Sequence, residues 1–168
     1  MVFCYHLSWI LFQNYINLDL IHNIKYFNYI QSKFDLIRDI ILNMDLDEIN
    51  KELSEIEALD LNSESKYYFL FSDSISILQT IVFRNENSDF RVSESITIFI
   101  DSIDMLIQEN LDIKNYSIEI EKLIENHYLF SEVSILFDNL TNYLNSIKKI
   151  DKDIFDELRD SLMLNIKL

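Results

Sequence analysis

The distribution of hydrophobic and polar residues predicts one long apolar helix in the middle of the chain, between Lys66 and Phe83. Its apolar residues recur at steps of three and four along one broad side, which is the spacing of a helix face. Its polar residues form a narrow strip of mostly small side chains, which neighbouring helices can approach closely. We therefore expect this segment to be the buried central helix of the protein. The broad side comprises Tyr67, Leu70, Phe71, Ser74, Ile75, Leu78, Ile81 and Val82, and the polar strip comprises Ser72, Asp73, Ser76, Gln79 and Thr80.

Helical spacing of apolar residues also occurs before and after this segment, whereas strand-like alternation does not. The expected helices cover approximately residues 5–17, 24–42, 92–110, 127–147 and 152–164, and a short helical turn covers residues 118–125. One more helix begins near Asp45, whose carboxylate is expected to cap it while Glu48 reaches back, as in a capping box. The links are too short to separate domains. The pattern predicts an all-α fold, a single domain over residues 1–168 with about six or seven helices in one bundle.

The chain contains neither glycine nor proline, the residues that normally end helices and shape turns. Asparagine tolerates the left-handed backbone conformation better than most other residues. Several asparagines lie where a helical pattern ends, among them Asn43, Asn87, Asn110 and Asn126. We expect asparagine to take the place of glycine at such positions.

The chain is strongly acidic, with 29 Asp and Glu residues against 14 Lys and Arg residues and a formal net charge of −15. Such a surface repels phosphate backbones and anionic lipids, so we expect no nucleic acid and no membrane among its partners. No apolar run approaches the ~20 residues that a membrane span requires. The N-terminal apolar run lacks the basic region and the cleavage site of a signal peptide. The single cysteine, Cys4, fits a reducing compartment, and we expect a cytoplasmic protein.

Residues that could hold a metal ion or act as a nucleophile are few. The absence of glycine excludes the glycine-rich phosphate loops and the nucleophile elbow. The histidines His6, His22 and His127 are scattered, and the Asp19–His22 pair occurs once, whereas a di-iron carboxylate site needs such a pair twice. Cys4 lies in an apolar stretch without a group that would lower its pKa, so a buried structural thiol is expected. We expect no metal site and no cofactor.

One polar constellation remains as a candidate site: Asp73 on the central helix, His127 and Arg159. A carboxylate on an otherwise apolar helix must be paired, capped or at the surface, because burying it unpaired costs several kcal/mol. An interhelical site that uses these three residues is one hypothesis, and a structural salt bridge or capping bond of Asp73 is the more frequent alternative. Asp101 and Asp104 share a helix face and could act as an acid and a base, but they lie opposite an apolar stripe, which is typical of a solvated face.

A family resemblance is carried by short segments between residues 34 and 166, namely Phe34-Asp35-Leu36-Ile37, SDSISILQTIV with Asp73, SESITIFIDSIDMLIQE, Asn126-His127-Tyr128-Leu129, Leu158-Arg159 and Asn165-Ile166. They resemble segments of the YjaG-like family of bacterial proteins, a domain of unknown function. The chain departs from that family at Arg38, which replaces a tryptophan, at Tyr128, which replaces a proline, and at Leu164 and Lys167, which replace a serine and a glycine. The resemblance implies an all-helical bacterial domain without an assigned activity or cofactor.

Two functional hypotheses follow from the sequence. The first is a non-enzymatic protein–protein interaction module, because the chain is acidic and contains no assembled catalytic or cofactor motif. Its partner would be a basic protein, and one version of this hypothesis is an immunity-like protein that neutralises a toxin by masking a cationic active site. A homo-oligomer is compatible with either hypothesis. The alternative is a small-molecule-binding or enzymatic bundle with an interhelical site that includes Asp73, His127 and Arg159.

Overall fold

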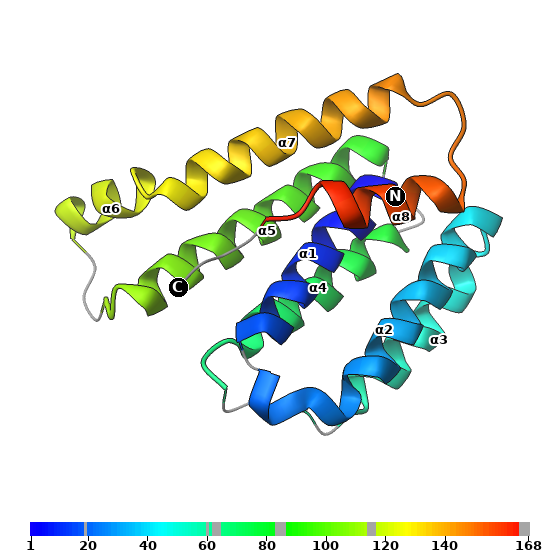
Figure 1. Ribbon diagram of the computed structural model, residues 1–168, viewed down its shortest axis with the longest axis horizontal. Coiled ribbons are helices and arrows are strands. Elements are labelled where there is room, and N and C mark those ends of the chain that lie inside the picture. The colour runs from blue at the N-terminus through cyan, green and yellow to red at the C-terminus, as the bar shows by residue number, and fades with distance from the viewer. Residues whose placement is uncertain (19, 60, 62–64, 83–86, 114–116, 165–168) are drawn as a thin grey trace.

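The computed structural model describes residues 1–18, 20–59, 61, 65–82, 87–113 and 117–164, and for residues 20–25 it describes the backbone alone (Figure 1). In this part of the chain the secondary structure consists of eight α-helices, and none of these residues lies in a strand. The helices form one bundle around a packed hydrophobic core, which confirms the predicted all-α fold. They are α1 (Val2–Leu18), α2 (Leu20–Asn43), α3 (Leu46–Glu57), α4 (Tyr68–Ile81), α5 (Ser88–Asn110), α6 (Ile118–Glu125), α7 (Tyr128–Ser146) and α8 (Lys152–Ser161).

The bundle has two flanks with a central group of helices between them. Helices α6 and α7 follow one another along one long side, and α2 and α3 lie as a pair on the opposite side (Figure 1). Helices α1, α4 and α5 lie between these flanks, and α8 packs on α1 and α2 (Figure 1). The sequence pattern predicted about six or seven helices and only a short helical turn at residues 118–125. In the structure these residues form a separate helix, α6, so the described residues contain eight helices.

Helix α1 lies at the centre of the bundle. It contacts α2, α4, α5, α7 and α8, and its most extensive interface is with α4. Every residue from Val2 to Phe12 is buried, as expected of a helix that is apolar on all sides. The predicted burial of the middle segment is confirmed for α4, where Ser74 and Ile75 are buried. Helix α4 begins at Tyr68 and ends at Ile81, and Phe83 lies outside the described residues.

A pair of buried serines lets α1 and α4 approach each other closely. The hydroxyl of Ser8 donates to the backbone oxygen of Ser74 over 2.7 Å, and the two hydroxyl oxygens are 3.1 Å apart. Neither side chain is exposed to solvent. The sequence pattern placed Ser74 on the broad apolar side of this segment, and its small side chain is the packing surface here; its hydroxyl bonds across the interface instead of within its own helix.

The beginnings of the helices differ in part from the prediction. Asp45 occupies the N-cap position of α3, but its side chain makes no capping hydrogen bond, so the expected capping box is wrong. Helix α5 begins at Ser88, four residues before the predicted start, because the side-chain oxygen of Asn87 accepts a hydrogen bond from the backbone N–H of Phe90 over 2.8 Å. The apolar periodicity alone did not reveal this exposed first turn.

Two helices end in a Schellman motif without glycine. After α2, Asp45 N–H donates to Ile40 O over 3.3 Å and Met44 N–H donates to Ile41 O over 3.2 Å, with Met44 at φ 58°. After α5, the same pattern places Asp112 at φ 48°. The expectation that asparagine would occupy the left-handed positions is wrong at these two ends, because Asn43 and Asn110 are the last helical residues and the left-handed residue lies beyond them.

Candidate functional site

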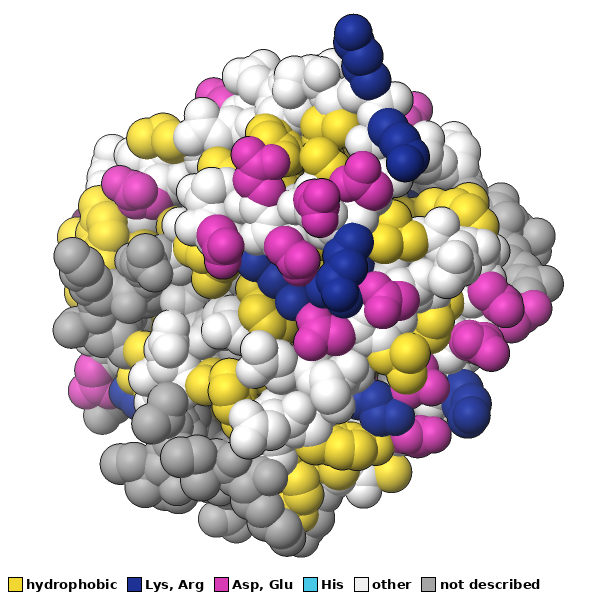
Figure 2. Space-filling model, turned by 45° about the vertical axis from the view of Figure 1, so that its right-hand side comes forward, with side chains coloured by type: hydrophobic (Ala, Val, Ile, Leu, Met, Phe, Trp, Pro, Cys, Tyr) yellow, Lys and Arg dark blue, Asp and Glu magenta, His cyan; other side chains and the backbone are white. Residues whose placement is uncertain are grey.

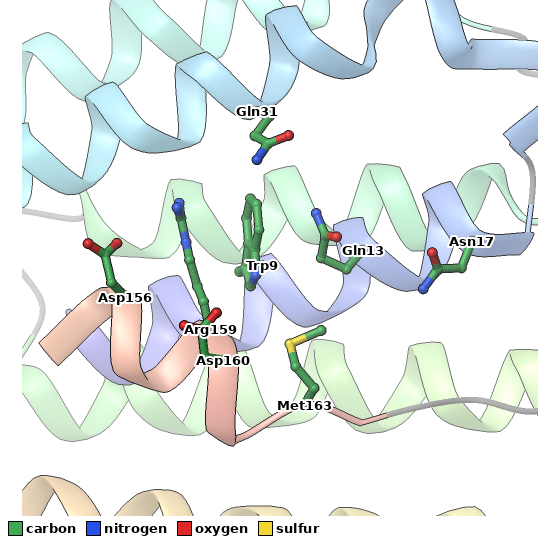
Figure 3. Close-up of a pocket in the computed structure, with 8 residues that line it drawn as sticks. All are labelled: Trp9, Gln13, Asn17, Gln31, Asp156, Arg159, Asp160 and Met163. Carbon is green, nitrogen blue, oxygen red and sulfur yellow. The ribbon is translucent and has the colours of Figure 1, made fainter. Parts of the chain in front are cut away.

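A pocket of about 550 Å³ lies between α1, α2 and α8 (Figure 3). Helix α1 contributes side chains at steps of four residues. Helix α8 and Met163, which lies just beyond its end, contribute side chains at steps of three and four. Each of these two helices therefore presents one face to the pocket. Figure 3 shows the acidic and basic side chains of α8 at one end, the amides of α1 at the other, and the tryptophan between them. The lining residues are Trp9, Gln13, Asn17, Gln31, Asp156, Arg159, Asp160 and Met163.

The chain that follows α8 is fixed on α1 and closes one side of this pocket. Nε2 of His6 donates a hydrogen bond to Leu162 O over 2.6 Å, and Nδ2 of Asn14 donates to Leu164 O over 2.9 Å. Burial lowers the pKa of His6 to about 4, so its imidazole is neutral at physiological pH and its Nε2 carries the proton that makes this bond. Two buried polar side chains of α1 thereby hold Met163 at the edge of the pocket.

Arg159 is held in one position by three groups. Its Nη1 donates to Asp35 Oδ1 over 2.6 Å, and its Nη2 donates to the hydroxyl of Tyr5. Its guanidinium carbon lies 3.9 Å from the centre of the Trp9 ring, in a cation–π arrangement. Burial raises the pKa of Tyr5, so the phenol stays protonated and its hydroxyl donates onward to Phe34 O over 3.0 Å. The guanidinium is therefore pre-organised at the pocket wall.

A second arginine, Arg38, links the acidic side chains next to the pocket. Its Nε donates to Asp39 Oδ1 over 2.9 Å, and its Nη1 donates to Asp156 Oδ1 over 3.0 Å and to Asp35 Oδ1 over 3.3 Å. Figure 2, in which the side with α2 and α3 is turned forward, shows basic side chains in the middle of this face with acidic ones around them. Because four aspartates including Asp160 accompany two arginines here, negative charge is in excess around the pocket.

Two buried hydrogen-bond donors at the pocket have no partner among the described residues: Nε2 of Gln13 and Nε of Arg159. A third buried atom without a partner, Oδ1 of Asp104, lies on α5, away from the lining residues. A buried donor without an acceptor costs about 1–3 kcal/mol, so proteins rarely retain such donors without a reason.

The structure places the three residues of the predicted constellation in three separate settings. Asp73 on α4 accepts a hydrogen bond from Ser102 Oγ on α5 over 2.7 Å, and burial raises the pKa of its carboxyl. His127 is the N-cap of α7, where its Nδ1 accepts a hydrogen bond from the backbone N–H of Leu129 over 3.4 Å. Arg159 alone lines the α1–α2–α8 pocket. No hydrogen bond or ion pair within the described ranges joins any two of the three. The partner of Asp73 is a serine hydroxyl on the neighbouring helix, which is neither the salt bridge nor the capping bond of the alternative prediction.

The other candidate groups have simple structural settings. Cys4 is fully buried and its thiol donates to Arg91 O over 3.8 Å, as expected of a structural thiol. The side chains of the Asp19–His22 pair lie outside the described residues. Among the side chains that are described, no group of three or more His, Cys, Asp or Glu residues is placed to hold a metal ion. Within the same residues, no helix combines the length and the apolar character needed to cross a membrane.

The sequence analysis identified Arg159 but missed the rest of the pocket. A signal was present in α1, because Trp9, Gln13 and Asn17 are spaced i, i+4 and i+8 in a segment that is otherwise apolar. Gln31 gave no sequence signal, because it lies on a helix face that carries several polar residues.

Comparison of the chain with protein-family models, with curated proteins and with solved structures finds no match. The resemblance of residues 34–166 to the YjaG-like family therefore stays a prediction. Its segment at Asn165-Ile166 lies outside the described residues.

Proposed function

We propose that this protein binds a small polar molecule in the α1–α2–α8 pocket. The observation that carries the proposal is the guanidinium of Arg159 in the pocket wall, which is already held by Asp35, by the hydroxyl of Tyr5 and by the Trp9 ring. The volume of about 550 Å³ is in the range of ligand sites in proteins.

The proposed role is binding without catalysis. The lining consists of amides, one arginine, two aspartates, a tryptophan and a methionine, which are groups that orient a ligand through hydrogen bonds and contact. Arg159 is already fixed by Asp35 and by the Trp9 ring, so little side-chain freedom is lost when a ligand binds. The other two residues of the predicted polar constellation, Asp73 and His127, are engaged in hydrogen bonds elsewhere. We propose a cytoplasmic location, as the sequence analysis expected.

The fluorescence of Trp9 can report binding in the pocket, because Trp9 is the only tryptophan of the chain and lines the pocket. A metabolite library is screened by thermal shift, and every compound that raises the melting temperature is titrated while tryptophan fluorescence is recorded. We expect such compounds to change the emission of Trp9, because they bind beside it. The variants Gln13→Met and Arg159→Lys should lose both effects, since each replaces a polar side chain of the pocket lining.

The matched control is Gln79→Met, which removes an amide on α4 that donates to Glu57 over 2.8 Å and is not part of the pocket. This variant should bind like the wild type. Compounds that stabilise the protein without changing Trp9 emission, or that bind both pocket variants unchanged, would contradict the proposal.

A second function, the interaction module with a basic protein partner, is supported by the surface between residues 101 and 138. The exposed side chains of α5, α6 and α7 in this range, called the α5–α7 surface, include apolar and acidic groups, and Lys122 is the one lysine or arginine among the described residues of the range. Exposed apolar groups within a charged rim are typical of binding surfaces. The exposed apolar residues are Met105, Leu111, Ile118, Leu123, Tyr128 and Ile135, and the exposed acidic residues are Asp101, Glu109, Asp112, Glu119, Glu121, Glu125, Glu132 and Asp138.

This second proposal includes the toxin-neutralising version, since a cationic active site is one basic surface that such a face could cover. It predicts a co-purifying basic protein whose binding weakens as salt is raised. The double variant Glu132→Lys and Ile135→Asp on the exposed side of α7 should abolish that binding, whereas Asp47→Lys on α3 should not. Binding that resists salt or survives the double variant would count against the α5–α7 surface.

A further inference from the structure

We infer that residues 162–164 form a movable wall of the α1–α2–α8 pocket, which admits a ligand when it leaves α1 and continues helix α8. These three residues, called the 162–164 strap, directly follow the last residue of α8, Ser161. This inference rests on the proposed function and adds how access to that binding site is controlled. It follows from a mismatch in the strap, whose sequence favours a helix and whose backbone is not helical.

The sequence of the strap contains no signal that ends a helix. Residues 162–164 are Leu, Met and Leu, which are good helix formers, and the apolar periodicity predicted a helix as far as residue 164. Helix α8 nevertheless ends at Ser161, and Leu162 lies outside the helical region at φ −118° and ψ 72°. None of the described residues after α8 adopts the left-handed conformation that follows α2 and α5. The local sequence therefore does not explain where α8 ends.

Two buried side chains of α1 hold the strap out of the helical conformation. Nε2 of His6 donates a hydrogen bond to Leu162 O over 2.6 Å, and Nδ2 of Asn14 donates to Leu164 O over 2.9 Å. His6 and Asn14 are 1% and 2% exposed, and Leu164, which belongs to the hydrophobic core, is 3% exposed. The contacts that end α8 are therefore tertiary contacts with α1, and a change in α1 can remove them.

Continuation of α8 gives the strap a second arrangement. Residues four positions apart lie on the same face of a helix, so Leu162 would follow Leu158, which is buried. Leu164 would follow Asp160, which is exposed, and would lose its burial. The helical state keeps the burial of one leucine and adds backbone hydrogen bonds, but it gives up the burial of the other leucine and both bonds to α1. We expect it as a minor state with a population of about 0.1–10%.

Met163 connects the strap to the pocket. It lies between the two residues whose carbonyls are held by α1, and it lines the pocket together with Trp9 and Gln13 of α1. Figure 3 shows its side chain reaching from the strap towards α1. When the strap leaves α1, this side of the pocket opens, and solvent reaches Trp9, which is 5% exposed in the strap state.

The variants His6→Leu and Asn14→Leu test this exchange, because each removes the donor that holds one carbonyl of the strap. Each should raise the population of the helical state by up to about tenfold, which is the effect of one hydrogen bond. The ¹³Cα chemical shifts of residues 162–164 should then move towards helical values. Acrylamide quenching of Trp9 fluorescence should increase, and it reports this site alone because the chain has one tryptophan. Using two variants keeps the test valid if one of them fails to fold.

The matched control is Ser8→Ala, which removes a buried hydrogen bond of α1 that is directed to Ser74 O on α4 and not to the strap. It should lower stability without changing either readout. Equal changes in Ser8→Ala would overturn the inference, because they would reflect a general loss of stability. Unchanged chemical shifts in the two folded strap variants would overturn it as well, and so would stronger quenching without helical shifts, because the strap would then not continue α8.

Both readouts are recorded without a ligand, so they separate this inference from the proposed function. If the strap moves and no compound of the metabolite library changes the emission of Trp9, the proposed function fails, and with it the role of the strap in access, while the exchange between strap and helix stands. If compounds bind and the two strap variants leave both readouts unchanged, the movable wall is overturned while the pocket remains a binding site.

Discussion

Asp35 on α2 and Arg159 on α8 form an ion pair across 124 residues of sequence, in which Arg159 Nη1 donates to Asp35 Oδ1 over 2.6 Å. The same oxygen accepts a second hydrogen bond from Arg38 over 3.3 Å. The side chain of Arg159 is 12% exposed and that of Asp35 is 42% exposed, so the pair lies at the boundary between protein and solvent. One carboxylate thus connects two helices and fixes the arginine that forms the pocket wall.

The variant Asp35→Asn should lower the free energy of unfolding by about 1–3 kcal/mol, because it leaves two largely buried arginines without their shared anion. Asp39→Asn is the matched control, since Asp39 is 50% exposed and Arg38 is its ion-pair partner among the described residues, and its cost should stay below about 1 kcal/mol. Urea denaturation of the three proteins measures both values. Equal losses in the two variants would show that the Asp35–Arg159 ion pair stabilises the protein no more than the exposed Asp39–Arg38 pair does.

Acidification should destabilise the protein through His6. The pKa of His6 is lowered to about 4 in the folded protein, against about 6.5 in the unfolded chain, so the unfolded state binds more protons between these values. The contribution of His6 to stability is complete above pH 6.5 and is lost as the pH falls towards 4, which corresponds to about 2 kcal/mol between pH 7 and pH 5. Denaturation curves of the wild type and of His6→Gln, recorded at both pH values, isolate this effect because the carboxylates titrate in both proteins. An identical pH dependence of the two would contradict it.

Replacing Met44 by glycine should stabilise the protein by about 1 kcal/mol. Met44 adopts φ 58° after α2, where a side chain carries a steric penalty that glycine avoids, and it is 63% exposed, so little packing is lost. Ala58 ends α3 with an ordinary φ of −74°, so Ala58→Gly should instead destabilise by about 0.5–1 kcal/mol. Thermal denaturation of both variants should give melting temperatures that move in opposite directions.

The close contact of α1 and α4 should tolerate no larger side chain at Ser74. Ser74→Leu places an extra volume against Ser8 and breaks their hydrogen bonds, and we expect a loss of about 3 kcal/mol or a failure to fold. Ser72→Leu, two residues earlier on the exposed side of the same helix, should change stability by less than about 0.5 kcal/mol. Circular dichroism and urea denaturation measure the difference in stability between the two variants. Equal stabilities would mean that α1 and α4 can move apart to accommodate a larger side chain without loss of stability.

The sequence by itself determined the fold class and the approximate positions of the helices. Apolar residues at steps of three and four are sufficient for this, because the periodicity of a helix is a local property. It also predicted that Asp73 must be paired, capped or at the surface, which follows from the cost of desolvating a carboxylate. The helix ends were less predictable, since the left-handed conformation of Met44 and Asp112 is imposed by the direction that the chain takes after each helix.

The tertiary structure alone decided which helix lies at the centre and which polar residues meet. Helix α1 is more completely enclosed than α4, although both are apolar, because enclosure depends on how many neighbours pack around a helix. Gln13, Gln31 and Arg159 come from three distant parts of the chain, and only the packing of α8 on α1 and α2 brings them to one pocket. The two donors without a partner could not be predicted either, since whether a buried polar atom finds an acceptor depends on the positions of all its neighbours in space.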